Sequence, residues 1–140
     1  GYAVTRHSSG KISVVMWNYC HYTEEANDSR TIQNAVGTPE LYGMFQDDPA
    51  KEFTVTLPGL EDGVRIETTV FDREHGSVLD AWFEMGSPNH ILREDLEVLC
   101  QQMELETIVE RLPAQSDPFT WTFTVQQHGV TLIDITASAS

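Results

Sequence analysis

The stretch that decides the fold is FTWTFTVQQHGVTLIDIT, residues 119–136. Apolar and polar residues alternate through its first half, which is the pattern of a β-strand with one buried face. The step His128-Gly129 interrupts this pattern and is typical of a turn. A second run of mostly apolar and β-branched residues follows. We therefore predict two strands in direct succession, Phe119–Gln126 and Val130–Thr136.

Four more segments have strand character, and turn residues separate them. Ser9-Gly10 predicts a hairpin turn between the first two, and Asp62-Gly63 lies in the connection between the last two. Short strands in this number predict a mainly β fold, an antiparallel β-sandwich with a short two-helix insertion. The four segments are Tyr2–His7, Lys11–Cys20, Glu52–Leu57 and Val64–Asp72, and Glu104–Arg111 is a further candidate strand.

The helical insertion covers residues 77–103. Its first helix, Ser77–Met85, carries apolar residues on one side and ends at Gly86-Ser87-Pro88. Its second helix runs near Arg93–Met103, where leucines recur at helical spacing. The apolar residues that mark the two helices are Val78, Trp82, Met85, Leu92, Leu96, Leu99 and Met103.

A long loop, residues 23–51, separates the second predicted strand from the third. It shows little periodicity, and structureless connections of nearly thirty residues are uncommon in compact domains, where they are often functional or disordered. Its apolar residues should dock on a surface, either the core of this domain or another domain. These residues are Leu41, Tyr42, Met44 and Phe45.

Composition limits the function classes. The 140 residues fit a single domain, 1–140, that can bury its own core. The formal net charge of -14 argues against nucleic-acid and anionic-membrane binding, because both need clustered cations. We expect Cys20 and Cys100 to be two free, buried thiols of a cytoplasmic protein. A disulfide between them is the alternative. Because a strand begins almost at Gly1, we expect this domain to be a fragment of a larger protein.

Motifs for chemistry are missing from the sequence. The five histidines have no metal-ligand spacing, and neither a nucleophile elbow nor a phosphate-binding loop occurs. Acidic residues such as Glu67, Asp72 and Asp80 lie at polar positions, where a solvated face is the simplest interpretation. We therefore predict no catalytic residue, no metal site and no cofactor. Trp17, Trp82 and Trp121 are expected in the core.

Binding residues are predicted around the start of the long loop, where ligand and interface contacts often lie. Tyr19, His21 and Tyr22 end the second strand and open the loop, and Tyr42 and Phe45 lie within it. Aromatic and imidazole side chains in such places can contact a sugar or a neighbouring domain.

One segment, FDREHGSVLDAWFEMGSP at 71–88, resembles the C-terminal region of family 39 glycoside hydrolases, the β-xylosidase family. Val14–Tyr19 is similar to the first core strand after the barrel of that family, and His128–Ile135 to its last strand. The resemblance covers nearly the whole chain and is most specific over Gly76–Pro88. The chain departs from the family pattern at Leu92, where a Thr that caps the second helix is often found.

The resemblance implies a β-sandwich that packs against a (β/α)₈ barrel, which holds both catalytic glutamates in this family. The Asn-Glu-Pro motif of the acid/base glutamate is absent here, so no catalytic residue is carried over. Asn18–Tyr22 and Leu41–Phe45 also look like a version of the module found at the end of AraC-type transcription regulators. Such a parent would bind DNA through a separate helix-turn-helix domain.

Three functions therefore remain open from the sequence. The leading hypothesis is a non-catalytic accessory domain of a β-xylosidase-like or AraC-type parent. A carbohydrate-binding module is the second, because Tyr19, Tyr22 and Tyr42 gather around the loop. An independent enzyme is the third.

Overall fold

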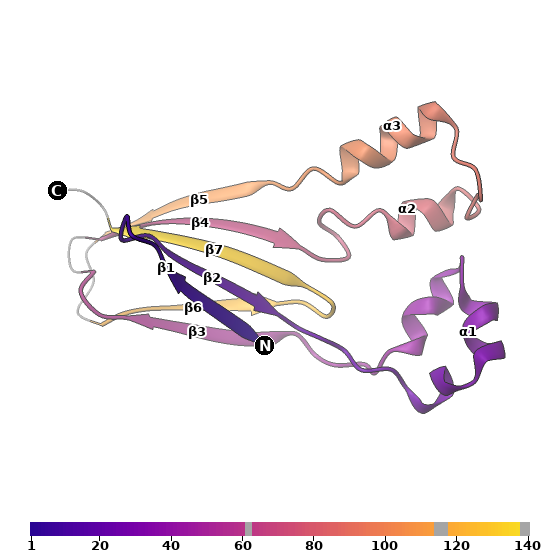
Figure 1. The fold of residues 1–140 in the computed structure, drawn as a ribbon, viewed down its shortest axis with the longest axis horizontal. Helices are drawn as coiled ribbons and strands as arrows, with labels where there is room; N and C mark the ends of the chain where they lie inside the picture. Colours follow the sequence, from indigo (N-terminus) through magenta and orange to yellow (C-terminus); the bar gives the residue numbers. More distant parts are fainter. Residues whose placement is uncertain (61–62, 114–117, 138–140) are drawn as a thin grey trace.

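The computed structural model describes residues 1–60, 63–113 and 118–137, and within these ranges the fold is mainly β. Two antiparallel sheets face each other (Figure 1). The larger has the strand order β1-β2-β7-β4-β5 and the smaller has β3-β6, so the predicted sandwich is confirmed. The strands are β1 (Tyr2–Arg6), β2 (Ile12–Trp17), β3 (Lys51–Leu57), β4 (Val64–Phe71), β5 (Thr107–Leu112), β6 (Phe119–Val125) and β7 (Val130–Ala137).

The stretch 119–136 forms two strands that belong to different sheets. β6 pairs with β3, whereas β7 pairs with β2 and β4. The turn between them is closed by the amide of Gly129, which donates to the Gln126 carbonyl at 2.9 Å. His128 adopts a φ of 58°, a left-handed conformation in which histidine is enriched among non-glycine residues. This turn therefore carries the chain from one layer of the sandwich to the other.

The core lies between the two sheets and follows the alternation of the strands. In the large sheet, Val14, Ile133 and Ile66 point inward from the three central strands. Phe119 and Phe123 of β6 oppose them from the small sheet. Burying such side chains stabilises the fold by roughly 1.5–3 kcal/mol each relative to exposing them.

The long loop contains more regular structure than its sequence suggests. It folds into η1 (Glu24–Asn27), α1 (Ser29–Ala35) and η2 (Pro39–Met44), so the expectation of a structureless connection is wrong. Each helix has two turns or fewer, which is too short to show a 3.6-residue period. Asp28 starts α1 by accepting a hydrogen bond from the amide of Arg30 at 3.1 Å.

Both predicted helices of the insertion are present, as α2 (Leu79–Glu84) and α3 (Arg93–Gln102). The helix α3 begins at Arg93 although its N-cap residue, Leu92, makes no side-chain capping bond. Of its apolar residues Leu99 is buried, while Leu92, Leu96 and Met103 are exposed. The stretch after α3 forms β5, as proposed for Glu104–Arg111, but that strand begins three residues later.

Two expectations about burial need correction. Cys20 is a buried free thiol, but Cys100 is exposed, because α3 turns only Leu99 of this stretch inward. Trp17 is 37% exposed, because β2 ends there and this residue faces away from the opposite sheet. Trp121, in contrast, packs against the core. No helix within the described ranges is long and apolar enough to cross a membrane.

Replacing Ile133, a fully buried residue of the central strand β7, should test the core assignment. We expect Ile133→Ala to lower the free energy of unfolding by about 3 kcal/mol, because it leaves a cavity between the sheets. Leu132→Ala, one residue away on the outer face, is the matched control and should cost less than about 1 kcal/mol. Urea denaturation followed by circular dichroism measures both, and equal losses would contradict the assigned faces.

Candidate functional site

Two helical arms leave the same end of the sandwich and meet beyond it (Figure 1). The first arm is residues 23–45 and the second arm is residues 72–106. They touch where the Ser87 hydroxyl donates to the carbonyl of Gly37. Gly37 has a φ of 84°, and a Cβ there would lie 3.2 Å from the Ser87 Cβ, so a glycine permits this close contact.

The first arm is closed at its base by backbone pairing. Tyr22 and Phe45 form an antiparallel bridge, and their rings stack at 4.7 Å between centroids. The amide of Gln46 donates to the His21 carbonyl at 2.8 Å, and the amide of Thr23 donates to the Met44 carbonyl at 2.9 Å. The arm is therefore a closed loop whose two ends lie side by side.

Two adjoining cavities lie where the arms meet the end of the sandwich, and we call them together the inter-arm cleft. Their volumes are about 520 and 240 Å³. The larger is lined mainly by polar residues of β4, β6 and the turns that follow them. Both cavities share Tyr42, Asp72, Arg73 and His128, so these four residues define the cleft.

Asp72 organises the tight loop that follows β4. Its Oδ1 accepts hydrogen bonds from the amides of Glu74 and His75, both at 2.9 Å, and lies 2.7 Å from His75 Nδ1. The Asp72 side chain is 6% exposed, whereas that of His75 is 62% exposed. A carboxylate that holds Nδ1 leaves Nε2 of the imidazole available for a hydrogen bond with a ligand.

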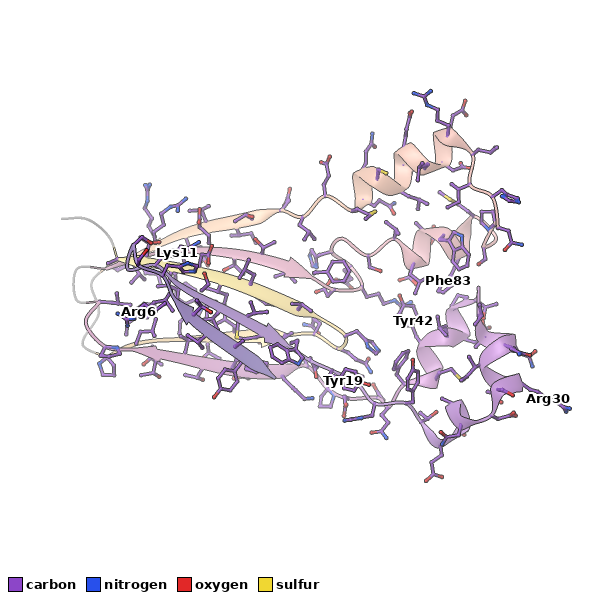
Figure 2. All side chains as sticks on the ribbon, viewed as in Figure 1. Arg6, Lys11, Tyr19, Arg30, Tyr42 and Phe83 are labelled. Carbon is purple, nitrogen blue, oxygen red and sulfur yellow. The ribbon has the colours of Figure 1, made fainter. Side chains whose placement is uncertain are left out.

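Arg73 connects the two arms. Its guanidinium makes two hydrogen bonds with Asp80, at 2.6 and 3.0 Å, and lies 3.9 Å from the centre of the Tyr42 ring. Figure 2 shows Tyr42 of the first arm near Phe83 of the second arm, and the centroids of their rings lie 6.3 Å apart in an edge-to-face arrangement. Burial, together with the Asp80 carboxylate, raises the pKa of Tyr42 above its ordinary value.

His128 fills the gap between the first arm and the β6–β7 turn. Its ring lies 4.4 Å from that of Phe45 and 6.5 Å from that of Tyr42. Burial lowers the pKa of His128 below its ordinary value of 6.5, because the charged imidazolium loses hydration. The neutral ring therefore holds the first arm against the sandwich.

The inter-arm cleft offers hydrogen-bonding groups to a ligand. It presents a carboxylate, a guanidinium and two imidazoles, which suit a polar organic ligand or a polar segment of a partner. Among the described residues, no group of three or more His, Cys, Asp or Glu side chains could hold a metal ion. The candidate catalytic carboxylates Asp72 and Asp80 are engaged by His75 and Arg73.

The residues predicted from sequence lie in two places. At the base of the first arm Phe45 and Tyr42 contact His128, and Tyr22 stacks on Phe45. Tyr19 and His21 contact each other in an edge-to-face pair, with ring centroids 5.0 Å apart. The apolar residues Tyr42 and Phe45 thus dock on this chain itself, and their predicted role in binding stays a prediction.

Sequence reasoning missed Asp72, Arg73 and His128 as residues of the cleft. The sequence pattern places Asp72 at the end of a strand on a solvated face and His128 in a turn, and it gives no separate role to Arg73. A signal was present in His128-Gly129, because a bulky residue in a turn that needs a positive φ often has a second role. The partners of Arg73 and His128 come from distant segments, which no local pattern shows.

Comparison with known proteins supports the fold. The chain matches no protein-family model and no curated protein sequence. It resembles a monomeric β-xylosidase from Caulobacter crescentus CB15, with a TM-score of 0.69 and 16% identity over 99% of this chain and 26% of that one. A GH39 enzyme from Xanthomonas axonopodis pv. citri gives a TM-score of 0.71 and 10% identity over 98% and 26%. At these identities the likeness establishes a shared fold, and this chain spans about a quarter of each enzyme.

The buried carboxylate of Asp72 should contribute to stability. We expect Asp72→Ala to lower the free energy of unfolding by about 2 kcal/mol, because two backbone amides and His75 lose their acceptor. Glu74→Ala removes an exposed neighbouring carboxylate and is the control, with an expected change within about 0.5 kcal/mol. Equal urea midpoints for the two variants would count against the role given to Asp72.

His128 should make stability depend on pH. Its folded pKa lies below the unfolded value, so the unfolded chain binds the proton more tightly. The stabilisation is complete above the unfolded pKa of 6.5 and is lost as pH falls through the folded pKa. His128→Asn tolerates the positive φ and should flatten the fall in stability below pH 6.5. Urea midpoints of the wild-type chain and of His128→Asn, measured across this pH range, test the prediction. Parallel curves of midpoint against pH for the two proteins would refute it.

Proposed function

We propose that this chain is a non-catalytic accessory domain whose β-sandwich packs against a (β/α)₈ barrel of a larger, GH39-like protein. The observation that carries the proposal is the extent of the structural match. It spans 98–99% of this chain but 26% of each solved enzyme, so the matched unit is a whole domain here and a part there. A domain of this kind contributes packing and position to an active site elsewhere.

The state of the acidic residues supports a non-catalytic role. Glycoside hydrolysis needs two carboxylates that face a substrate across a cleft. Here Asp72 is bound by His75 and two amides, and Asp80 is bound by Arg73. Glu67 pairs with Arg65 at 2.5 Å on the outer face of the large sheet. None of these three carboxylates is free to act as a nucleophile or an acid without losing its partner.

An apolar row on the large sheet supports packing against another domain. Trp17, Val130 and Phe71 are neighbours in register across β2, β7 and β4, and all three are exposed. Leu132 lies two residues after Val130 on the same face of β7 and is exposed as well. A contiguous apolar patch of this kind on a sheet face marks an interaction site.

We propose a hydrolase as the parent, because both solved structures above are described as GH39 or β-xylosidase enzymes. An AraC-type regulator remains the alternative parent, since the same packing would serve a barrel that senses a sugar. Carbohydrate binding by this domain is the second candidate function, favoured by the polar lining of the inter-arm cleft. Calorimetric titration with xylose and xylo-oligosaccharides separates it from the accessory role, which produces no binding heat.

A non-catalytic accessory domain should have no glycosidase activity of its own. The purified chain should release no nitrophenol from p-nitrophenyl β-xyloside above the buffer rate, because Glu67, Asp72 and Asp80 are each held by a partner within the described residues. If turnover is detected, the rates of Asp72→Asn and Glu67→Gln show whether either carboxylate is responsible for it. Turnover that one of these substitutions abolishes would contradict the proposal.

A further inference from the structure

The two sheets differ in width, and the difference leaves one strand uncovered. The large sheet has five strands and the small sheet two, within the described ranges. Tyr2 and Val4 of β1 pair with Met16 and Val14, which are buried in the core, so all four face inward. Yet Tyr2 is 68% and Val4 is 55% exposed, because neither β3 nor β6 reaches over β1.

A groove lies beside β3 and above β1. Its volume is about 380 Å³, and Tyr2, Val4, Val14 and Met16 form its floor. Its wall consists of five consecutive residues of β3, Phe53–Leu57. Side chains of consecutive strand residues point to opposite faces, so a wall of this kind includes the backbone edge of the strand.

Thr54 shows that the backbone edge of β3 borders the groove. Its hydroxyl bonds that of Thr122 at 3.2 Å on the outer face of the small sheet, while the residue still borders the groove. Among the described strands, β3 pairs with β6 alone, so one edge of β3 carries unpaired amide and carbonyl groups. An extended strand can bond such an edge and cover an apolar floor in one step, whereas a helix can do only the second.

We propose that this groove receives an extended β-strand from the partner domain inferred above, which adds to β3 as the third strand of the small sheet. The inference rests on the proposed function and specifies how the partner attaches. The incoming segment covers a strand of seven residues, Lys51–Leu57. It carries apolar side chains at alternate positions, which pack on Tyr2 and Val4, and polar ones between them.

Charge distinguishes this occupant from a second copy of the chain. Each copy carries a formal net charge of -14, so two copies repel each other at low salt. The first residues of β3, Lys51 and Glu52, are charged, and charged edge residues discourage pairing between identical sheets. A neutral or basic strand meets neither obstacle.

The test uses a synthetic peptide of sequence KVTVTVK, acetylated and amidated. Its control is KVVTTVK, which has the same composition without the alternation. We expect about 1 mM KVTVTVK, the effective concentration of a tethered strand, to slow amide hydrogen exchange in residues 51–57, and KVVTTVK to have no such effect. Equal protection by both peptides, or none by either, would overturn the inference.

Variants of β1 locate the binding surface. Val4→Lys places a charge on the groove floor and should weaken KVTVTVK binding about tenfold. Thr5→Lys, on the opposite face of the same strand, should leave the binding unchanged. Equal effects of the two variants would overturn the inference. A dimer of the chain that Val4→Lys dissociates, as measured by analytical ultracentrifugation, would also overturn it, because a second copy would then fill the groove. Aryl-xyloside turnover contradicts the proposed function separately, since it involves neither β1 nor β3.

Discussion

The turn at residues 126–129 is the constraint on which most of this structure depends. It takes the chain from β6 in the small sheet to β7 at the centre of the large one, so it joins the two layers around one core. Its His128, in a left-handed conformation, also reaches the aromatic residues of the first arm. The same few residues thus link the layers of the sandwich and hold the arm that bounds the inter-arm cleft.

The sequence predicts the strands well, because period-two alternation in β3, β4 and β6 directly reflects one buried face. It predicts the two helices of the insertion from a different period, because apolar residues recur there at the three- and four-residue spacing of a helix. It fails at α1 and the two short helices beside it, which are held by tertiary contacts and an Asp28 cap more than by an apolar stripe. It also fails at Cys100 and Trp17, where the missing information is which face of an element has a neighbour.

The candidate site shows the same limit. The aromatic residues Tyr42 and Phe45 could be singled out, because apolar side chains in a long loop must dock on some surface. Their partners could not, since Arg73 and His128 come from segments 30 and more residues away. The contacts show that these aromatics fasten the first arm to the sandwich. The inter-arm cleft is a consequence of that fastening, lined by groups that the fold already needs.

Two surfaces fit the proposed attachment of this domain to a larger protein: the apolar row on the large sheet and the groove beside β3. The mass of the polypeptide that carries this chain in its source cells tests this account most directly. An antibody against the chain should detect a polypeptide of roughly four times 15.8 kDa, because the chain spans 26% of the enzymes that share its fold. A single band at 15.8 kDa, with no larger species in native gels, would contradict it.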